Sequence, residues 1–108
     1  MTAATLAAEP ELLGTEYDVV IVGSGYGGAV TAARLGFANA ATGGKLRIAV
    51  LERGKEYPTG TFPETQEGAL REVWSPWNPL GLIQIHRNDD VDVLQASGLG
   101  GTSLINFN

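Results

Sequence analysis

Hydrophobic residues form two short, almost uninterrupted runs in the first half of the chain, and these runs predict strands. Residues 17–22, YDVVIV, are rich in β-branched side chains, and residues 45–52, KLRIAVLE, form a second run of strand length. A continuous apolar run is typical of a parallel strand that is buried on both faces. We therefore expect two parallel strands, the second of which ends in the carboxylate of Glu52.

Between these runs, the apolar residues follow a helical spacing. Val30, Ala33 and Phe37 recur at intervals of three and four positions within residues 29–41, AVTAARLGFANAA. This spacing predicts a helix whose narrow, small-residue face packs against the sheet. The pair Gly43-Gly44 follows and predicts the end of the helix. The order of strand, helix and strand is one βαβ unit, so the predicted fold class is α/β.

The second half of the chain has a less regular pattern. Residues 53–63, RGKEYPTGTFP, predict a loop. Residues 63–74, PETQEGALREVW, predict a short helix with Pro63 at its first position. The segments LIQIHR and VDVLQ, separated by NDD, predict a hairpin or two successive short strands. A glycine cluster follows in ASGLGGTSLINFN, residues 96–108.

The glycines after the first predicted strand have the spacing of a phosphate-binding loop. Gly23, Gly25 and Gly28 form G-x-G-x-x-G between that strand and the predicted helix. In such a loop the first glycine permits a tight turn, the second admits a pyrophosphate and the third lets helix and strand pack closely. The start of the helix then offers N–H groups and partial positive charge to the phosphates. This context predicts dinucleotide binding in a Rossmann-like fold.

Glu52 narrows the choice of dinucleotide. It lies 24 positions after Gly28, close to the ~20 typical of an acid that hydrogen-bonds a ribose. Its carboxylate accepts hydrogen bonds from ribose hydroxyls and repels a 2′-phosphate, which disfavours NADP. Arg53 follows, and we interpret it as a solvated side chain at the strand end. FAD and NAD both remain compatible with these residues.

Composition and charge exclude several other classes. The chain has 108 residues, a net charge of −5 and no cysteine. The negative charge disfavours a nucleic-acid partner, and the lack of cysteine excludes disulfides and thiolate metal sites. No run approaches the ~20 apolar residues of a membrane span. Residues 1–15 contain no Lys or Arg, so we expect a flexible tail without a signal peptide and, by default, a cytoplasmic location.

Three stretches together resemble the glucose–methanol–choline oxidoreductases, in particular their cholesterol-oxidase-like branch. They are YDVVIVGSGYGGAVTAARL, VLERGKEYPTGTFPET and GLGGTSLINFN, and the resemblance covers roughly residues 16–108. It implies an N-terminal part of a Rossmann-like FAD-binding domain, with FAD as cofactor and an alcohol as substrate. It also implies hydride transfer from the alcohol carbon to the flavin. Free-standing, non-catalytic dinucleotide binding and an NAD-dependent dehydrogenase remain alternatives.

The resemblance also implies a set of cofactor-binding residues. The phosphate loop would be formed by the glycines and a tyrosine, Glu52 would bind the ribose, and a later group would contact the flavin end through backbone N–H groups and the Asn amide. The set is Gly23, Gly25, Tyr26, Gly27, Gly28, Glu52, Gly101, Thr102 and Asn106. Without the resemblance, GLGGTS alone indicates a turn and a helix cap. Asn106 is followed by Phe107, where many relatives place glycine.

The remaining residues with reactive or aromatic side chains favour structural roles. We interpret His86 as a strand-end histidine with one hydrogen bond, and Asp89, Asp90 and Asp92 as a solvated turn with no metal site. Trp74 and Trp77 are expected to cover the core.

We assign no catalytic residue, because the resemblance places the proton-abstracting histidine far toward the C-terminus of its members. We expect an incomplete FAD-binding domain without a substrate domain, inactive and of low stability by itself, whose alcohol is bound by residues outside this chain.

Overall fold

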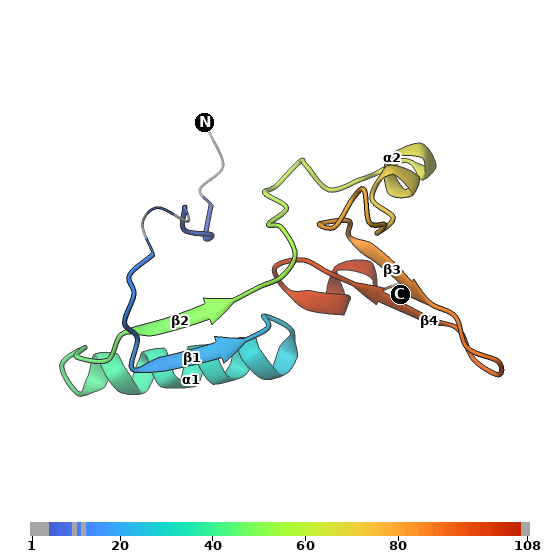
Figure 1. Ribbon diagram of the computed structural model, residues 1–108. Helices are drawn as coiled ribbons and strands as arrows, with labels where there is room; N and C mark the ends of the chain where they lie inside the picture. The colour runs from blue at the N-terminus through green and yellow to red at the C-terminus, as the bar shows by residue number, and fades with distance from the viewer. Residues whose placement is uncertain (1–4, 10, 12, 107–108) are drawn as a thin grey trace.

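The first half of the chain forms a βαβ unit in the computed structural model, which describes residues 5–9, 11 and 13–106. Strands β1 (Val19–Val22) and β2 (Ile48–Leu51) pair in parallel, with Val19 opposite Ile48 and Val22 opposite Leu51. Helix α1 (Tyr26–Ala41) connects them and contacts both (Figure 1). The parallel α/β arrangement predicted from the two apolar runs is confirmed.

Helix α1 packs with a different face from the one that the apolar spacing predicts. Val30 and Phe37 are 61% and 78% exposed. The residues turned toward the sheet are Gly28, Ala32, Leu35 and Asn39, which are less exposed than their neighbours. The predicted packing face is therefore wrong. Gly28 lies against the Gly23 carbonyl, and this contact fixes the rotation of the helix.

The limits of α1 follow from local backbone groups. The helix begins at Tyr26, three residues before the predicted start, because Gly25 is the N-cap and accepts the first helical bond from Ala29 N–H. At the other end, Gly43 and Gly44 both have positive φ, and Gly44 N–H donates to Asn39 O at 2.7 Å. The predicted glycine stop is confirmed.

The second half forms a short helix and a hairpin. Helix α2 (Gln66–Arg71) is followed by β3 (Ile83–His86) and β4 (Val93–Ala96), which pair antiparallel (Figure 1). Of the two predicted alternatives, a hairpin or two successive short strands, the hairpin is confirmed. The predicted helix start at Pro63 is wrong, because Thr65 is the N-cap and its Oγ1 accepts from Gly68 N–H at 3.0 Å.

A 3₁₀ turn, η2 (Gly101–Ile105), completes the described chain and contacts β4. A bridge between Lys55 and Gly98 joins the segment after β2 to the segment after β4. The two halves therefore meet where β2 and β4 end. Residues 1–4, 10 and 12 of the predicted tail, and Phe107, lie outside the described residues.

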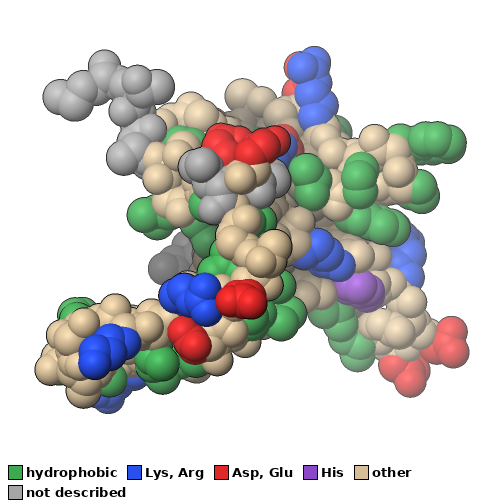
Figure 2. Space-filling view, turned by 60° about the vertical axis from the view of Figure 1, so that its left-hand side comes forward, with side chains coloured by type: hydrophobic (Ala, Val, Ile, Leu, Met, Phe, Trp, Pro, Cys, Tyr) green, Lys and Arg blue, Asp and Glu red, His purple; other side chains and the backbone are tan. Residues whose placement is uncertain are grey.

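Few large side chains are buried among the residues that the structure describes. The buried hydrophobic residues are Ile21, Leu82 and Ala96, of which Leu82 is 1% exposed. Figure 2 shows hydrophobic side chains distributed over the surface among the charged ones. Trp77 is 93% exposed and Trp74 is 38% exposed. Both tryptophans were predicted to cover the core, and this prediction is wrong for Trp77. Within the described residues, no helix has the length and apolarity needed to cross a lipid bilayer.

Candidate functional site

The turn between β1 and α1 has the geometry that the glycine spacing predicts. Gly23 has φ 91°, a left-handed conformation, and its N–H donates to Leu51 O at 2.7 Å. A side chain on Gly25 would meet no atom within 4 Å, so the backbone there faces open space. A side chain on Gly28 would overlap the Gly23 carbonyl. The three positions thus provide a turn, an accessible backbone and a close helix–strand contact.

The N-terminal end of α1 faces this open space, and none of the described side chains caps it. The N-cap is Gly25, no side chain caps the helix, and its first turn contains no acidic residue. The first-turn N–H groups of a helix lack partners within the helix and carry partial positive charge. This end of α1 is therefore suited to an anionic group that approaches Gly25.

Glu52 lies at the carboxyl end of β2 and is held against the same turn. Its Oε2 accepts from Ser24 N at 3.0 Å and from Ser24 Oγ at 2.5 Å, and its Oε1 accepts from Gly54 N at 2.8 Å. Burial raises the pKa of this carboxyl, but the bonds from Ser24 and from nearby backbone N–H groups outweigh it and leave the pKa below its usual value. Glu52 is thus an anion at neutral pH.

Ser24 is a site residue that the sequence pattern did not reveal. It occupies a variable position of the glycine motif, and only 6% of it is exposed. Its hydroxyl contacts Glu52 and also lies 3.0 Å from Gly100 N, in the second glycine cluster. The two glycine clusters are adjacent at a second point as well, because a side chain on Gly101 would come within 2.8 Å of Gly25 Cα.

These residues line one cleft of about 410 Å³ between the βαβ unit and the hairpin. The glycine turn and the end of β2 form one wall, and β3, β4 and η2 form the other. From the predicted set, the cleft brings together Gly23, Gly25, Glu52, Gly101 and Thr102. Its other lining residues are Val22, Ser24, Leu51, Arg53, Gln84, His86, Gln95, Ala96 and Ser97.

The other predicted site residues do not line the cleft. Tyr26, Gly27 and Gly28 form the first turn of α1, and the Tyr26 side chain is 72% exposed. Asn106 is the C-cap of η2 and is exposed. Thr102 is close to the hairpin, since its Oγ1 lies 3.4 Å from Ala96 N.

Two further charged or titratable side chains line the cleft: Arg53 follows β2 on the first wall, and His86 ends β3 on the second. Arg53 is exposed, which confirms its interpretation as a solvated side chain, and it also donates from Nε to Ser97 Oγ at 3.2 Å and from Nη2 to Gln84 Oε1 at 2.7 Å. The bridge between Lys55 and Gly98 brings the hairpin, and with it these partners, to the end of β2, which the local sequence could not indicate. His86 Nε2 lies 3.1 Å from Gln95 Oε1, which confirms its single hydrogen bond.

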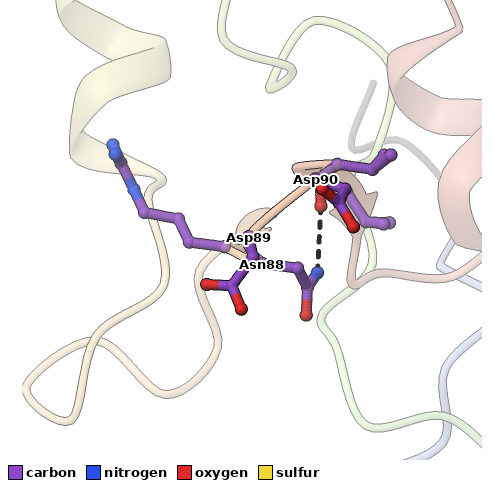
Figure 3. Close-up of a pocket in the computed structure, with 6 residues that line it drawn as sticks. Asn88, Asp89 and Asp90 are labelled. Atoms are coloured by element: carbon purple, nitrogen blue, oxygen red, sulfur yellow. Dashed lines mark hydrogen bonds between the residues drawn. The ribbon is translucent and has the colours of Figure 1, made fainter.

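A second hollow, of about 530 Å³, lies at the tip of the hairpin and is lined by residues 87–91 and Val93. Figure 3 shows the carboxylates of Asp89 and Asp90 pointing in different directions, while Asn88 Nδ2 donates to Val91 O at 3.1 Å. Among the described residues, no group of three or more His, Asp and Glu side chains is arranged to hold a metal ion. The hairpin tip is therefore an exposed turn stabilised by Asn88.

No protein-family model matches the chain. The chain is similar to part of several bacterial cholesterol oxidases. Over 90 residues, 82% of its length, it is 38% identical to proteins named cholesterol oxidase from two strains of Mycobacterium tuberculosis, CDC 1551 and H37Rv. It is 30% identical over 90 residues to the cholesterol oxidase of Acinetobacter baumannii.

The similarity covers most of this chain but little of each relative. The chain spans 14% of the length of the M. tuberculosis proteins and 15% of that of the A. baumannii protein. The matched relatives are oxidoreductases by name, which agrees with the oxidoreductase class that the family resemblance implies.

Proposed function

We propose that this chain is the FAD-binding portion of a flavin-dependent oxidoreductase of the glucose–methanol–choline type, which oxidises an alcohol by hydride transfer to flavin. The observation that carries the proposal is the convergence of the glycine turn and the Glu52 carboxylate on one cleft. The similarity to cholesterol oxidases supports flavin rather than nicotinamide as the redox group.

The residues of the cleft fit the ADP half of such a cofactor. Gly25 leaves space for a pyrophosphate beside its backbone, and the uncapped start of α1 favours negative charge. Glu52 is ionised and lies at the end of the adjacent strand, where it would accept a hydrogen bond from the adenosine ribose. The open space at Gly25 and the N–H groups of α1 would therefore receive the pyrophosphate, and the Glu52 carboxylate would receive the ribose next to it.

The opposite wall would hold the flavin end. Gly101 lies against Gly25, and Thr102 lines the same cleft. Both residues would therefore lie next to the pyrophosphate, on the side of the flavin. Asn106 would contact the flavin beyond them, at the end of η2.

When bound, FAD would supply the electron acceptor, and these residues would bind and orient it. The alcohol and its proton acceptor would be bound by residues outside this chain.

Titration calorimetry with FAD, ADP and NAD⁺ tests the proposal. We expect FAD to bind more tightly than ADP, because of the added flavin contacts, and Glu52→Ala to weaken both. The loss of a charge-assisted hydrogen bond is worth ~1.5–3 kcal/mol, or about tenfold to a hundredfold in Kd. Gly25→Val should weaken binding further, because its side chain would occupy the open space beside the turn.

Glu67→Ala is the matched control, since Glu67 is an exposed acid on α2 outside the cleft. Equal affinities of the parent chain and Glu52→Ala would contradict the ribose assignment. Tighter binding of NAD⁺ than of FAD would favour a nicotinamide-dependent dehydrogenase instead.

A further inference from the structure

The Ser24 hydroxyl lies where three separate segments meet. It is 2.5 Å from Glu52 Oε2 at the end of β2, 3.4 Å from Gly98 O and 3.0 Å from Gly100 N in the second glycine cluster. Ser24 itself belongs to the turn after β1 and is buried. One small side chain therefore connects the turn, the acid and the opposite wall of the cleft.

The distances determine how this hydroxyl is used. A serine hydroxyl donates one hydrogen and accepts through its lone pairs. Glu52 is charged and closer than the Gly98 carbonyl, so the hydrogen goes to Glu52 Oε2. The oxygen in turn accepts from Gly100 N–H.

This arrangement leaves one carboxylate oxygen of Glu52 for a ligand. Oε2 accepts both Ser24 N–H and Ser24 O–H, which uses its two lone pairs. Oε1 accepts Gly54 N–H and retains capacity for another donor. The orientation of Oε1 therefore depends on the anchoring of Oε2 by Ser24.

We propose that Ser24 is a positioning residue, which aims Glu52 Oε1 at a hydroxyl of the nucleotide ribose and ties the glycine turn to residues 98–101. This inference rests on the proposed function for the identity of the ligand. The anchoring of Glu52 and of Gly100 is a property of the chain without ligand, so the two can be tested separately.

The test compares Ser24→Ala with Ser103→Ala. Ser103 is a matched control, because its hydroxyl donates to Gly100 O at 2.9 Å in the same cluster but does not contact Glu52. Titration of the Glu52 side-chain carboxyl is followed by carbon NMR, and exchange of the Gly100 amide by hydrogen exchange. The other charged or titratable groups that line the cleft, Arg53 and His86, are unchanged in both variants.

We expect Ser24→Ala to move the Glu52 midpoint to higher pH, because a bond that stabilises the carboxylate is lost while its burial remains. Gly100 exchange should accelerate, and ADP affinity should fall about tenfold. Ser103→Ala should leave the Glu52 midpoint and Gly100 exchange as in the parent chain. A purely structural role would lower affinity without moving the midpoint.

An unchanged Glu52 midpoint and unchanged Gly100 exchange in Ser24→Ala would overturn the proposal. Thermal unfolding checks that each variant is folded. If Ser24→Ala does not fold, Ser24→Cys replaces it, since a thiol of similar shape is a weaker donor and should shift the midpoint in the same direction. If the parent chain does not bind ADP, the proposed function fails, and the NMR measurements still decide whether Ser24 positions Glu52.

Discussion

Two adjacent glycines at the start of α1 have opposite steric surroundings. A Cβ on Gly28 would overlap the Gly23 carbonyl, whereas a Cβ on Gly27 would meet no atom within 4 Å. We expect Gly28→Ala to destabilise the chain by ~1–3 kcal/mol, because the helix must move away from β1. Gly27→Ala should stabilise it by ~0.4–1 kcal/mol, because alanine fits the helical backbone there and reduces the conformational freedom of the unfolded chain. Urea unfolding of both variants measures the difference.

This pair controls for the effect of adding a methyl group to the helix. If Gly28→Ala were as stable as Gly27→Ala, the close contact between the start of α1 and β1 would not exist. The assigned role of the third motif glycine would then be lost as well.

At the scale of single residues, the sequence predicted the geometry at positions that have a fixed spacing, namely the glycine turn and the acid at the end of β2. Gly23, Gly25 and Glu52 were identifiable because a turn, a helix start and a strand end must follow one another in that order. Ser24 and Arg53 were not. Their partners, Gly100 for Ser24 and Gln84 for Arg53, are distant in sequence and become neighbours only when the hairpin docks beside β2.

At the scale of elements, the sequence predicted which segments are helical or extended, but it did not predict which face of α1 packs against the sheet. The spacing of Val30, Ala33 and Phe37 correctly indicated a helix but indicated the wrong face. The decisive information was the close contact at Gly28, from which Ala32, Leu35 and Asn39 follow at helical intervals toward the sheet. A packing face is better predicted from the residue with the tightest steric requirement than from the largest apolar side chains.

Helix α2 is anchored to the preceding loop by an acid at its C-cap. Glu72 Oε1 lies 2.9 Å from Lys55 Nζ, and Glu72 Oε2 accepts from Tyr57 OH at 2.7 Å. Burial raises the Glu72 pKa, but the bonds from Lys55 and Tyr57 outweigh it, so the pKa is lowered. Burial, together with the hydrogen bond and the charge of Glu72, raises the pKa of Tyr57.

These shifts predict how stability depends on pH. A carboxyl whose pKa is lower in the folded state stabilises it above the unfolded value, near 4.5, and this contribution is lost as the pH falls through the folded value. We expect Glu72→Gln to lower stability at pH 7 and to reduce the loss of stability on acidification. Thermal unfolding between pH 3 and pH 7, about the range in which carboxyls titrate, measures both effects.

Glu67→Gln is the control for this experiment, because Glu67 forms an exposed pair with Arg71 within α2. Exposed pairs contribute little, so its stability profile should follow that of the parent chain. Identical profiles for Glu72→Gln and Glu67→Gln would show that the cluster of Lys55, Tyr57 and Glu72 does not anchor α2.

At the scale of the whole molecule, the chain is extended and exposes much apolar surface. Its radius of gyration is 16.2 Å, compared with about 13 Å for a compact chain of this length. Val20, Val22 and Leu51 are exposed on the sheet face opposite α1, as are Val30 and Phe37 on the outer face of the helix. The sequence did not reveal this exposure, because the apolar runs of β1 and β2 are typical of strands buried on both faces.

Exposed apolar surface of this extent predicts self-association driven by the hydrophobic effect. Phe37 is the test position because its ring is largely exposed and lies away from the sheet. Covering such a side chain contributes ~1.5–3 kcal/mol, so Phe37→Lys should weaken association about tenfold or more without lowering the melting temperature. Leu35→Lys, on the sheet-facing side of α1, should instead lower the melting temperature. Sedimentation equilibrium over a range of concentrations measures the association. A parent chain that stays monomeric throughout would show that solvent contact at this helix face is tolerated, and that the exposed surface of α1 does not drive assembly.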